Sequence, residues 1–492
     1  MISEPRAESA SASYRWILPA AAAFLFSAAA LHRTTADPDL FGYLNFGGLF
    51  WGGGGFPRHD VFSYLPTAPE WIYHEWLFGV LLQPVYGALG GAALQAFRWA
   101  AAAGALFLCL AVARRRGATR FRMAVGLILA SVPFAIGFGP VRAQVLTYLF
   151  FALTLYFLDR FARDGRGRRL AVLVPVFAFW ANCHGGFVAG LALIGLHAAA
   201  AALSRTRVRP LLLLLAAASL ASLINPYGFA YWGYLARALF MPRPGIGEWL
   251  SVWDAARLGL YLDASLLFVI CAAIALLRAP GMRPRDPAAL LVLSATALEG
   301  FLHHRHIVFF ALAFLAYVPP LLLVRRADRL LAALGVGWST ALFAGWCVAA
   351  PPQGPPWRLA APDTSAAPPG ALGYPESAAL EILRRAPLGR PVRVLTELHW
   401  GEYLSYRFYP RILVGVDGRY ETVFPTGILN EYLDFERAGP GFGRFLDRYP
   451  ADAVLAAAGS PVDRRMARLP GWTAVYRDQG SAAYVRAGGP PP

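Results

Sequence analysis

The chain of 492 residues is 57% hydrophobic and only 15% charged, with a mean hydropathy of +0.46. Soluble domains carry about a quarter charged residues, so this composition excludes an ordinary soluble protein and indicates an integral membrane protein. The formal net charge of +16 comes from arginine alone, because the sequence contains no lysine. The arginines form short clusters between apolar runs, a pattern typical of cytoplasmic loops that argues against nucleic-acid binding.

Eleven apolar runs approach the length of about 20 residues that a membrane span prefers. In chain order they are 16–31, 94–112, 121–138, 145–161, 170–181, 187–203, 210–224, 258–277, 288–302, 307–324 and 330–350. The first run follows a polar N-terminus and has no convincing small-residue cleavage site before Arg33 and Asp37. We therefore interpret it as an uncleaved span rather than a signal peptide.

Arginine clusters give these spans an orientation. Five clusters, each separated from the next by two apolar runs, lie at 114–122, 160–169, 205–209, 278–285 and 325–329. This spacing puts all five on one face of the membrane, which the positive-inside rule makes the cytoplasmic face. The expected outer loops are those at 37–76, 142–144, 182–186, 225–253 and 303–306. This order requires the segment at 76–94 to lie along the membrane interface instead of crossing.

The first outer loop is acidic and aromatic. Asp37 and Asp39 flank Pro38, which keeps the backbone extended and holds both carboxylates near the same membrane surface. Such a pair could hold a divalent cation, Mg²⁺ or Mn²⁺, or one carboxylate could act as a general base. The alternative is structural for both residues: Asp37 or Asp39 could merely cap the following helix, since Asp39 directly precedes the segment at 40–49.

The amino-acid composition changes after Ala350. The Pro- and Ala-rich stretch at 351–372 predicts a linker between a transmembrane domain at 1–350 and a small domain at 373–492. Short apolar runs at 392–395, 411–416, 453–455 and 482–485 predict strands, and 377–385 and 441–449 predict helices. The predicted fold class is mainly α, a polytopic membrane protein of about 11 spans with a small C-terminal α/β domain. The odd number of spans puts that domain outside the cytoplasm.

The acidic residue after the first span, Asp39, is followed four positions later by Tyr43. This motif resembles the first-loop acidic motif of the C-type glycosyltransferase superfamily, integral membrane enzymes that use polyprenyl-phosphate-linked sugars as donors. The resemblance extends to Glu75-Trp76, before a predicted interfacial helix, and to Arg98 in the following span. It implies a C-type glycosyltransferase architecture.

Four further motifs are similar to those of a large group of uncharacterised bacterial membrane proteins. They are Asp60-Val61-Phe62-Ser63, His74-Glu75-Trp76-Leu77, Asn182-Cys183-His184-Gly185-Gly186 and Asp417-Gly418-Arg419-Tyr420. Together with the first-loop motif they extend over nearly the whole chain. The last motif follows a predicted strand and most simply forms a polar turn.

The resemblance implies roles for individual residues. The catalytic candidates are Asp39, Glu75 and Asp37. The substrate-binding candidates are Tyr43, Asp60, His74, Arg142, Gln144, Asn182, His184, His303 and Arg305. No residue is assigned to a metal. The chain has Asp-Pro-Asp where adjacent acids are usual in the superfamily, and Arg-Ala-Gln at 142–144 where a second acidic residue often lies. The second departure argues against a metal site built from both loops and favours a mechanism with a single base, Asp39.

In the implied mechanism Asp39 accepts the proton of an acceptor hydroxyl, which then displaces the lipid phosphate from the sugar with inversion. Arg142 and Arg305 are candidate phosphate ligands because a guanidinium group binds phosphate bidentately. The alternatives are an Arg305 that snorkels at a span end and a buried His184 that ties down its own turn.

These features predict an inverting glycosyltransferase that moves a hexosyl or pentosyl unit from a polyprenyl-phosphate donor to an envelope lipid, glycan or protein. Its location would be the outer face of the bacterial inner membrane, and its partners a polyprenyl-phosphate-linked sugar and membrane lipid. The alternative is a non-catalytic membrane component of envelope polysaccharide or lipid assembly or transport. A secondary transporter is disfavoured, because apart from Arg98 and Glu299 the charged residues gather near the predicted membrane surfaces.

Overall fold

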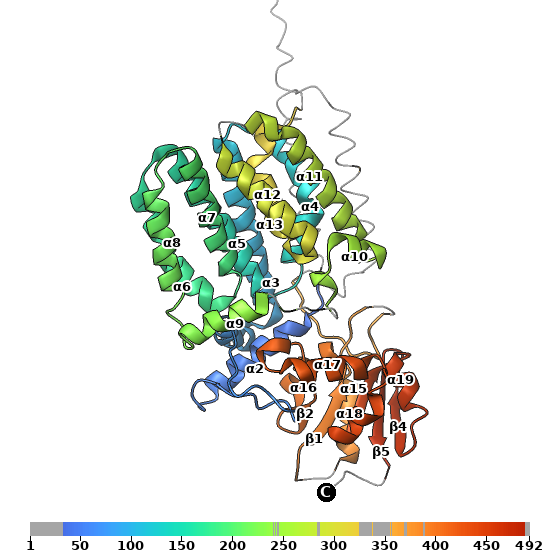
Figure 1. Cartoon of the computed structure of the whole chain (residues 1–492). Coiled ribbons are helices and arrows are strands. Elements are labelled where there is room, and N and C mark those ends of the chain that lie inside the picture. The colour runs from blue at the N-terminus through green and yellow to red at the C-terminus, as the bar shows by residue number, and fades with distance from the viewer. Residues whose placement is uncertain are drawn as a thin grey trace, which may run out of the picture. The chain divides into compact units, whose positions relative to one another are not determined.

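The computed structural model describes residues 33–239, 241, 243, 246–282, 286–323, 337, 355, 357–368, 371–386 and 389–487. The chain divides into two compact units. Unit 1 comprises Met1–Thr34, Gln95–Gly228 and Met241–Pro356, and unit 2 comprises Thr35–Leu94, Phe229–Phe240 and Trp357–Pro492. Unit 1 is a bundle of helices, whereas unit 2 contains a sheet with helices packed around it (Figure 1).

Unit 1 is helical throughout its described regular structure. Its helices are the second part of α3 (Trp76–Arg115), α4 (Arg120–Phe138), α5 (Gln144–Asp164), α6 (Leu173–Cys183), α7 (Phe187–Leu203), α8 (Arg209–Ala221), α10 (Val252–Arg257), α11 (Leu262–Met282), α12 (Pro287–Leu302) and α13 (Ile307–Tyr317). Short 3₁₀ helices are η1 (Gly167–Val172), η2 (Gly247–Trp249), η3 (His304–His306) and η4 (Pro319–Leu321). Helices α5 to α8 pack on one another, and α4, α11, α12 and α13 form a second packed group (Figure 1).

Four helices among the described residues, α3, α4, α5 and α11, are long and apolar enough to cross a membrane. Four shorter apolar segments, at α7, α8, α12 and α13, accompany them. These helices confirm the prediction of a mainly helical membrane protein. The predicted runs at 16–31 and 330–350 lie outside the described residues, except for Gly337. The count of eleven spans therefore stays a prediction.

Small residues allow close contact between neighbouring helices of unit 1. Gly190 of α7 faces α6, and a Cβ at this position would lie 2.5 Å from the ring of Trp180 and 2.8 Å from that of Phe177. Gly137 of α4 meets Tyr148 of α5 in the same way, at 2.6 Å. Such contacts are typical of membrane helices, whose association depends on van der Waals packing because lipid removes the hydrophobic driving force between them.

Ion pairs join arginine-rich helix ends in unit 1. Arg116, directly after α3, lies 2.6 Å from the buried carboxylate of Asp159 on α5. It also pairs with Asp286, the N-cap of α12, and stacks 4.3 Å from the ring centroid of Tyr317 at the end of α13. The arginine cluster that begins at 114, the one that begins at 160 and the start of α12 therefore lie at one end of the bundle, as the predicted orientation requires.

Unit 2 contains a five-stranded mixed sheet with the strand order β2-β1-β3-β5-β4. The strands are β1 (Val392–Thr396), β2 (Ile412–Val414), β3 (Ala453–Ala457), β4 (Trp472–Arg477) and β5 (Ser481–Arg486). Strands β2, β1 and β3 are parallel, and β5 is antiparallel to both β3 and β4. The helices of this segment are α15 (Glu376–Arg385), α16 (Leu398–Phe408), α17 (Thr426–Glu436), α18 (Phe442–Arg448) and α19 (Pro461–Met466). The expected C-terminal α/β fold is confirmed, and β4, α16, α17 and α19 were not predicted.

The first outer loop shares its core with this sheet. Helix α2 (Pro38–Trp51) packs against α16, and the ring of Phe41 lies 5.1 Å from Tyr374 and 4.9 Å from Tyr403. The segment around Ser63 pairs with the edge strand β2 through a parallel bridge to Val414. The loop therefore covers the open edge of β2, which would otherwise present unpaired backbone groups. Helix α9 (Phe229–Leu239) also belongs to this unit.

Helix α3 has 40 residues, a length of about 60 Å at 1.5 Å per residue. The hydrocarbon core of a bilayer is only about 30 Å thick. Gly90 interrupts the helix with φ 67° and ψ −165°, a backbone conformation that favours glycine, and the two units divide between Leu94 and Gln95. The part of α3 before Gln95 therefore belongs to unit 2, and the part that begins at Gln95 belongs to unit 1. Its placement along the membrane surface stays a prediction.

Candidate functional site

The two aspartates of the first loop lie at the start of α2. Asp37 is the N-cap, with an extended backbone (φ −82°, ψ 146°), and its Oδ1 accepts a hydrogen bond from the Asp39 N–H at 3.2 Å. Pro38 occupies the first helical position, where its missing N–H is tolerated. Asp39 lies in the first turn, where the helix dipole favours a carboxylate. The structural alternative, a helix cap, is therefore confirmed for Asp37 and wrong for Asp39.

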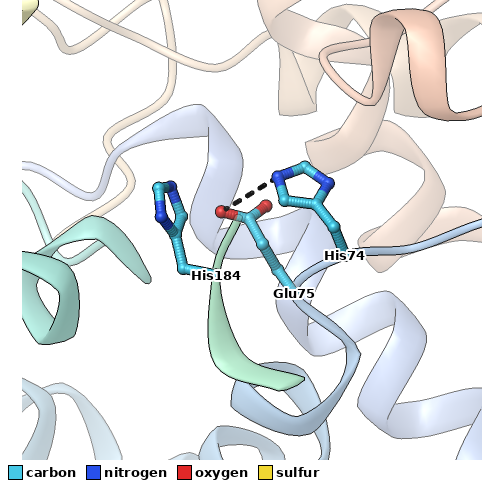
Figure 2. A group of neighbouring side chains, drawn as sticks. All are labelled: His74, Glu75 and His184. Carbon is cyan, nitrogen blue, oxygen red and sulfur yellow. Dashed lines mark ion pairs between the residues drawn. The ribbon is translucent and has the colours of Figure 1, made fainter. Parts of the chain in front are cut away.

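Glu75 lies within a chain of polar side chains in unit 2. Tyr43, one turn after Asp39 on the same face of α2, donates its hydroxyl hydrogen bond to Glu75 Oε1 at 3.4 Å. His74 Nε2 lies 3.8 Å from the same oxygen (Figure 2). On its other side, His74 Nδ1 lies 3.3 Å from the Tyr234 hydroxyl of α9, and the two rings stack at 5.5 Å. The structure thus brings together three predicted site residues, Tyr43, His74 and Glu75.

These groups are held in place but reachable. The side chains of His74 and Glu75 are 20% and 15% exposed. The side chains of Tyr43 and Tyr234 restrict their movement, so less conformational entropy remains to be lost when a ligand binds. A carboxylate in this setting can accept hydrogen bonds from the hydroxyl groups of a polar ligand.

A further carboxyl group, that of Glu402 on α16, lies against α2. A side chain at position 42 would collide with it, so Gly42 allows the two helices to meet. Asn45 of α2 donates from Nδ2 to the Glu402 backbone carbonyl at 3.0 Å. Burial raises the pKa of Glu402 well above its usual value, and the negative charges of Asp39 and Asp417 raise it further. This favours the protonated form. Its Oε2 has no hydrogen-bond partner among the described residues.

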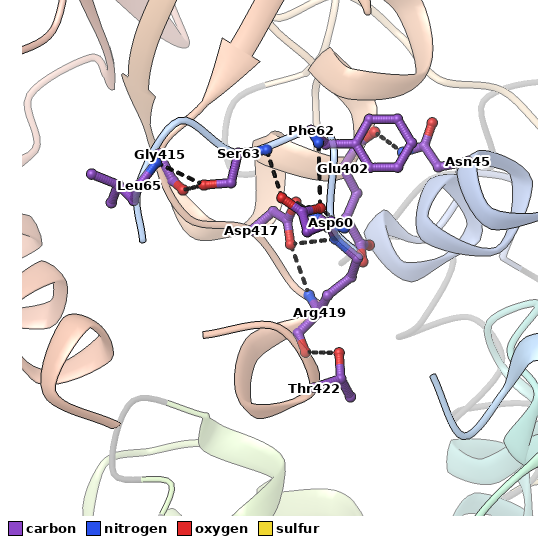
Figure 3. A network of polar contacts seen from close by, with 10 residues as sticks. All are labelled: Asn45, Asp60, Phe62, Ser63, Leu65, Glu402, Gly415, Asp417, Arg419 and Thr422. Atoms are coloured by element: carbon purple, nitrogen blue, oxygen red, sulfur yellow. Dashed lines mark hydrogen bonds and ion pairs between the residues drawn. The ribbon is translucent and has the colours of Figure 1, made fainter. Parts of the chain in front are cut away.

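Two motifs far apart in the sequence meet at Arg419 (Figure 3). Arg419 Nε donates to Asp417 Oδ1 at 2.9 Å, its Nη2 donates to Asp417 Oδ2 at 2.6 Å, and its Nη1 donates to Asp60 Oδ1. The guanidinium also lies over the rings of Phe62 and Trp71, 5.1 and 4.9 Å from their centroids. Burial opposes its charge, but the two carboxylates outweigh burial and raise the pKa of Arg419. The expected polar turn at 417–420 is present, because the Tyr420 N–H donates to the Asp417 carbonyl at 3.2 Å. The turn also belongs to a buried ion-pair network.

Asp60 also organises its own loop. Its Oδ1 and Oδ2 accept hydrogen bonds from the backbone N–H groups of Phe62 and Ser63 at 3.3 and 2.8 Å. The Ser63 hydroxyl donates to the Gly415 carbonyl at 2.5 Å (Figure 3). The Asp60 side chain is only 1% exposed. These contacts give Asp60 a structural role, holding the loop against the sheet edge.

In unit 1, Arg142 and Arg305 share a single carboxylate. Arg142 Nη1 donates to Glu248 Oε2 at 3.2 Å, and Arg305 Nη1 lies 3.3 Å from Oε1. Burial disfavours ionised Glu248, but the positive charges of Arg305 and Arg142 outweigh burial and lower its pKa to about 2. The three groups together therefore carry one net positive charge near neutral pH. Arg305 also stacks 4.4 Å from the Trp249 ring centroid.

This arginine cluster joins three loops. Arg142 precedes α5, Glu248 belongs to η2, and Arg305 lies in η3 between α12 and α13. All three loops were predicted to share the outer face, and the ion pairs place them at one end of unit 1. Arg305 is held by Glu248 and Trp249, which distinguishes it from a side chain that merely extends into water.

Asn182 and His184 hold the turn between α6 and α7. Asn182 Nδ2 donates to the carbonyls of Ala178 and Ile224, both at 2.7 Å. His184 Nδ1 accepts the Gly186 N–H at 2.8 Å and lies 2.8 Å from the Thr147 hydroxyl. These contacts support the structural interpretation of the motif. Gln144 is the half-buried first residue of α5, and His303 is the C-cap of α12.

Sequence reasoning missed three side chains that complete these clusters: Glu402, Glu248 and Tyr234. Glu248 lies in the predicted outer loop at 225–253, but it was not among the candidate site residues. Glu402 follows Trp400 and Gly401 in a short helix, and a lone acid among apolar and aromatic residues is the one local signal that could have marked it. Tyr234 lies in a helix rich in aromatic residues, where nothing in the local sequence separates it from Tyr231.

The bundle of apolar helices, the acidic first loop and the C-terminal mixed sheet together resemble the C-type integral membrane glycosyltransferases, and the structural comparisons confirm this at the level of the fold. ArnT from Cupriavidus metallidurans bound to undecaprenyl phosphate matches with a TM-score of 0.53 and 15% identity, over 97% of this chain and 98% of that chain. The same protein in the apo state matches with a TM-score of 0.54, 13% identity and the same coverage.

A third solved structure, the arabinofuranosyltransferase AftD from Mycobacteria, has a TM-score of 0.49 and 14% identity. That match covers 96% of this chain and 40% of AftD. No family model and no curated protein matches the sequence. At these identities the comparisons establish the fold alone.

Proposed function

We propose that this chain is an inverting membrane glycosyltransferase that transfers a hexosyl or pentosyl unit from a polyprenyl-phosphate donor to an envelope lipid, glycan or protein. The observation that carries the proposal is the fold. Over 97% of the chain it is similar to ArnT, one structure of which holds undecaprenyl phosphate. The chain also has an acidic group, Asp39, in the first turn of α2.

Asp39 is the proposed general base. Its carboxylate takes the proton of the acceptor hydroxyl while the hydroxyl oxygen attacks the anomeric carbon of the donor sugar. The bond from that carbon to the phosphate oxygen breaks, and its electron pair leaves with the lipid phosphate. Attack from the opposite side inverts the anomeric configuration. Asp37, as the N-cap, fixes the turn that carries Asp39.

Glu75 is the proposed hydrogen-bond acceptor for sugar hydroxyls. Its carboxylate is partly exposed, and Tyr43 and His74 restrict its orientation. Tyr43 and His74 therefore act as positioning residues in this proposal. Asp60 is assigned to the fold, because the Arg419 guanidinium and two backbone N–H groups engage its carboxylate.

Arg142 and Arg305 are the proposed ligands of the leaving phosphate. Guanidinium groups bind phosphate oxygens bidentately, and this cluster carries one more positive than negative charge. Glu248 holds both side chains before any ligand arrives. Such preorganised charge stabilises the leaving group without a cost of reorganisation at the moment of reaction.

We further propose that the chain lies in a bacterial inner membrane with its C-terminal segment outside the cytoplasm. The arginine clusters support this orientation through the positive-inside rule. A reporter that is active only outside the membrane should be active after Val485 and silent at Gly165. The opposite pattern would refute the orientation.

The function is tested with membranes that contain the full-length chain, incubated with a panel of radiolabelled polyprenyl-phosphate sugars. We expect label to enter an acceptor product only when the chain is present, with inverted anomeric configuration. If no donor supports transfer while the protein is folded in the membrane, the non-catalytic assembly role replaces the enzymatic one.

A further inference from the structure

Three side chains at the end of α12 form another polar cluster in unit 1. Glu299 and His303 are four positions apart and share a face of the helix end, and His306 follows in η3. His306 Nδ1 lies 3.1 Å from Glu299 Oε2, and His303 Nδ1 lies 3.7 Å from the same oxygen. One ligand atom from each of the three residues lies within 4.8 Å of the other two.

We propose that Glu299, His303 and His306 bind a divalent transition-metal ion, for which Zn²⁺ is the best match. Two imidazole nitrogens and one carboxylate oxygen are a common donor set for zinc sites with an open position. A tetrahedral ion with bonds of about 2.0–2.1 Å holds its ligand atoms about 3.3 Å apart. The two observed distances, 3.1 and 3.7 Å, lie on either side of that value. The third separation, between the two imidazole nitrogens, lies within 4.8 Å, so the proposal requires the histidine side chains to rotate until they meet the ion.

The state of His303 points independently to a ligand. Its Nδ1 is buried and has no hydrogen-bond partner among the described residues. The 3.7 Å separation from Glu299 Oε2 is longer than a hydrogen bond. Buried polar atoms are normally satisfied, and a metal ion between the two residues would satisfy this one.

Trp249 supports the two imidazole rings from one side. Its ring centroid lies 5.7 Å from that of His303 and 5.8 Å from that of His306, at interplanar angles of 79° and 72°. Arg305, between the two histidines in sequence, is held away from them by its pair with Glu248 and its stacking on Trp249. The Glu299 side chain is 54% exposed, which leaves the fourth coordination position open to water.

The test uses full-length protein purified in detergent and stripped with a chelator. Zn²⁺ is titrated against a chromophoric competitor, and Co²⁺ serves as a spectroscopic substitute. Wild type should bind one equivalent at this site, and bound Co²⁺ should show the visible absorption of a tetrahedral complex. Loss of one ligand should lower the affinity by more than about 10-fold, because even outer-shell partners of a metal site are worth 10–100-fold.

His303→Gln is the preferred variant, since His303 Nδ1 has no hydrogen bond to lose. Glu299→Gln is the second variant, and its Zn²⁺ affinity tests the site if His303→Gln aggregates. His59→Gln is the matched control, because His59 is an exposed histidine in the first loop, and it should retain the bound equivalent. Wild type that binds no Zn²⁺ or Co²⁺, or ligand variants that bind as tightly as wild type, would overturn the proposal.

Discussion

The charged clusters of the two units differ in their net charge and in how far their side chains are buried. In unit 1, two guanidinium groups share the partly exposed carboxylate of Glu248. In unit 2, one guanidinium, that of Arg419, is shared by two carboxylates that are at most 1% exposed. The buried carboxyl group of Glu402 adds a third acid to that network.

This difference fits the binding role that we propose for the arginine cluster of unit 1 and a structural role for the buried network of unit 2. A positive excess on accessible loops favours an anionic ligand, because the ligand meets preorganised donors and still exchanges easily with water. A buried excess of acids offers no such site. The buried negative charge must be balanced by hydrogen bonds, by the Arg419 guanidinium and by protonation of a carboxyl group. The side chains of this network therefore depend on one another for stability.

The largest expected effect comes from removing the only cation of the buried network. Arg419→Met leaves Asp60 and Asp417 buried without a positive partner, and breaking such a pair costs about 3–5 kcal/mol. We expect a large drop in the thermal unfolding temperature of the full chain in detergent. Arg448→Met is the control, since its pair with Glu431 is solvent-exposed and contributes little. Similar drops for both variants would contradict the contrast between buried and exposed pairs.

A smaller effect, on function instead of stability, is expected in the arginine cluster. Arg142→Gln leaves Arg305 and Glu248 as a neutral pair, so the affinity for the lipid phosphate should fall about 10-fold or more, the value of a charged hydrogen bond. KM for the donor should rise more than kcat falls. Arg257→Gln, which removes an exposed pair with Asp254, should leave both constants unchanged. A loss of folding with unchanged KM would instead make Arg142 structural, like Arg419.

The smallest expected effect is a change in pH dependence at Glu402. Its folded-state pKa is raised above the usual 4.5, so between 4.5 and the raised value the folded protein binds more protons than the unfolded chain. Wild-type stability therefore falls as pH rises through this window. Glu402→Gln cannot ionise and should lack that contribution, which makes it relatively more stable at higher pH.

The comparison is made as the difference in unfolding temperature between wild type and Glu402→Gln across the pH range. Burial also raises the pKa of Glu436, to about 7, but this contribution is common to both proteins and cancels in the difference. Glu431→Gln provides an exposed control. Parallel curves for wild type and Glu402→Gln would show that Glu402 titrates normally.

Local sequence predicted much of unit 2 but missed elements whose residues do not follow a simple pattern. Strands β1, β2, β3 and β5 are buried apolar runs and were predicted. Strand β4 is a mostly exposed edge strand, so it lacks the continuous apolar run of a buried strand. Helix α16 contains Gly401 and several aromatic residues, which have low helix propensity, and tertiary packing against α2 overrides this preference.

The candidate site, too, could be predicted only in part from local sequence. The motifs at 60–63 and 417–420 were both identified, yet their contact through Arg419 depends on the fold between them, which neither motif encodes. The cap of α2 was left open between Asp37 and Asp39, and Pro38 at the first helical position is the signal that identifies Asp37.

The most direct test of the central claim is the transfer rate of purified full-length Asp39→Asn beside Asp37→Asn. A general base contributes typically 10²–10⁴-fold, so Asp39→Asn should lose that much activity while it stays folded. Asp37→Asn should retain most of its activity, because asparagine caps a helix about as well as aspartate. A strong loss in Asp37→Asn that added Mg²⁺ or Mn²⁺ partly restores would favour a bound cation over a single base. Full activity in Asp39→Asn would contradict the assignment of Asp39 as the catalytic base.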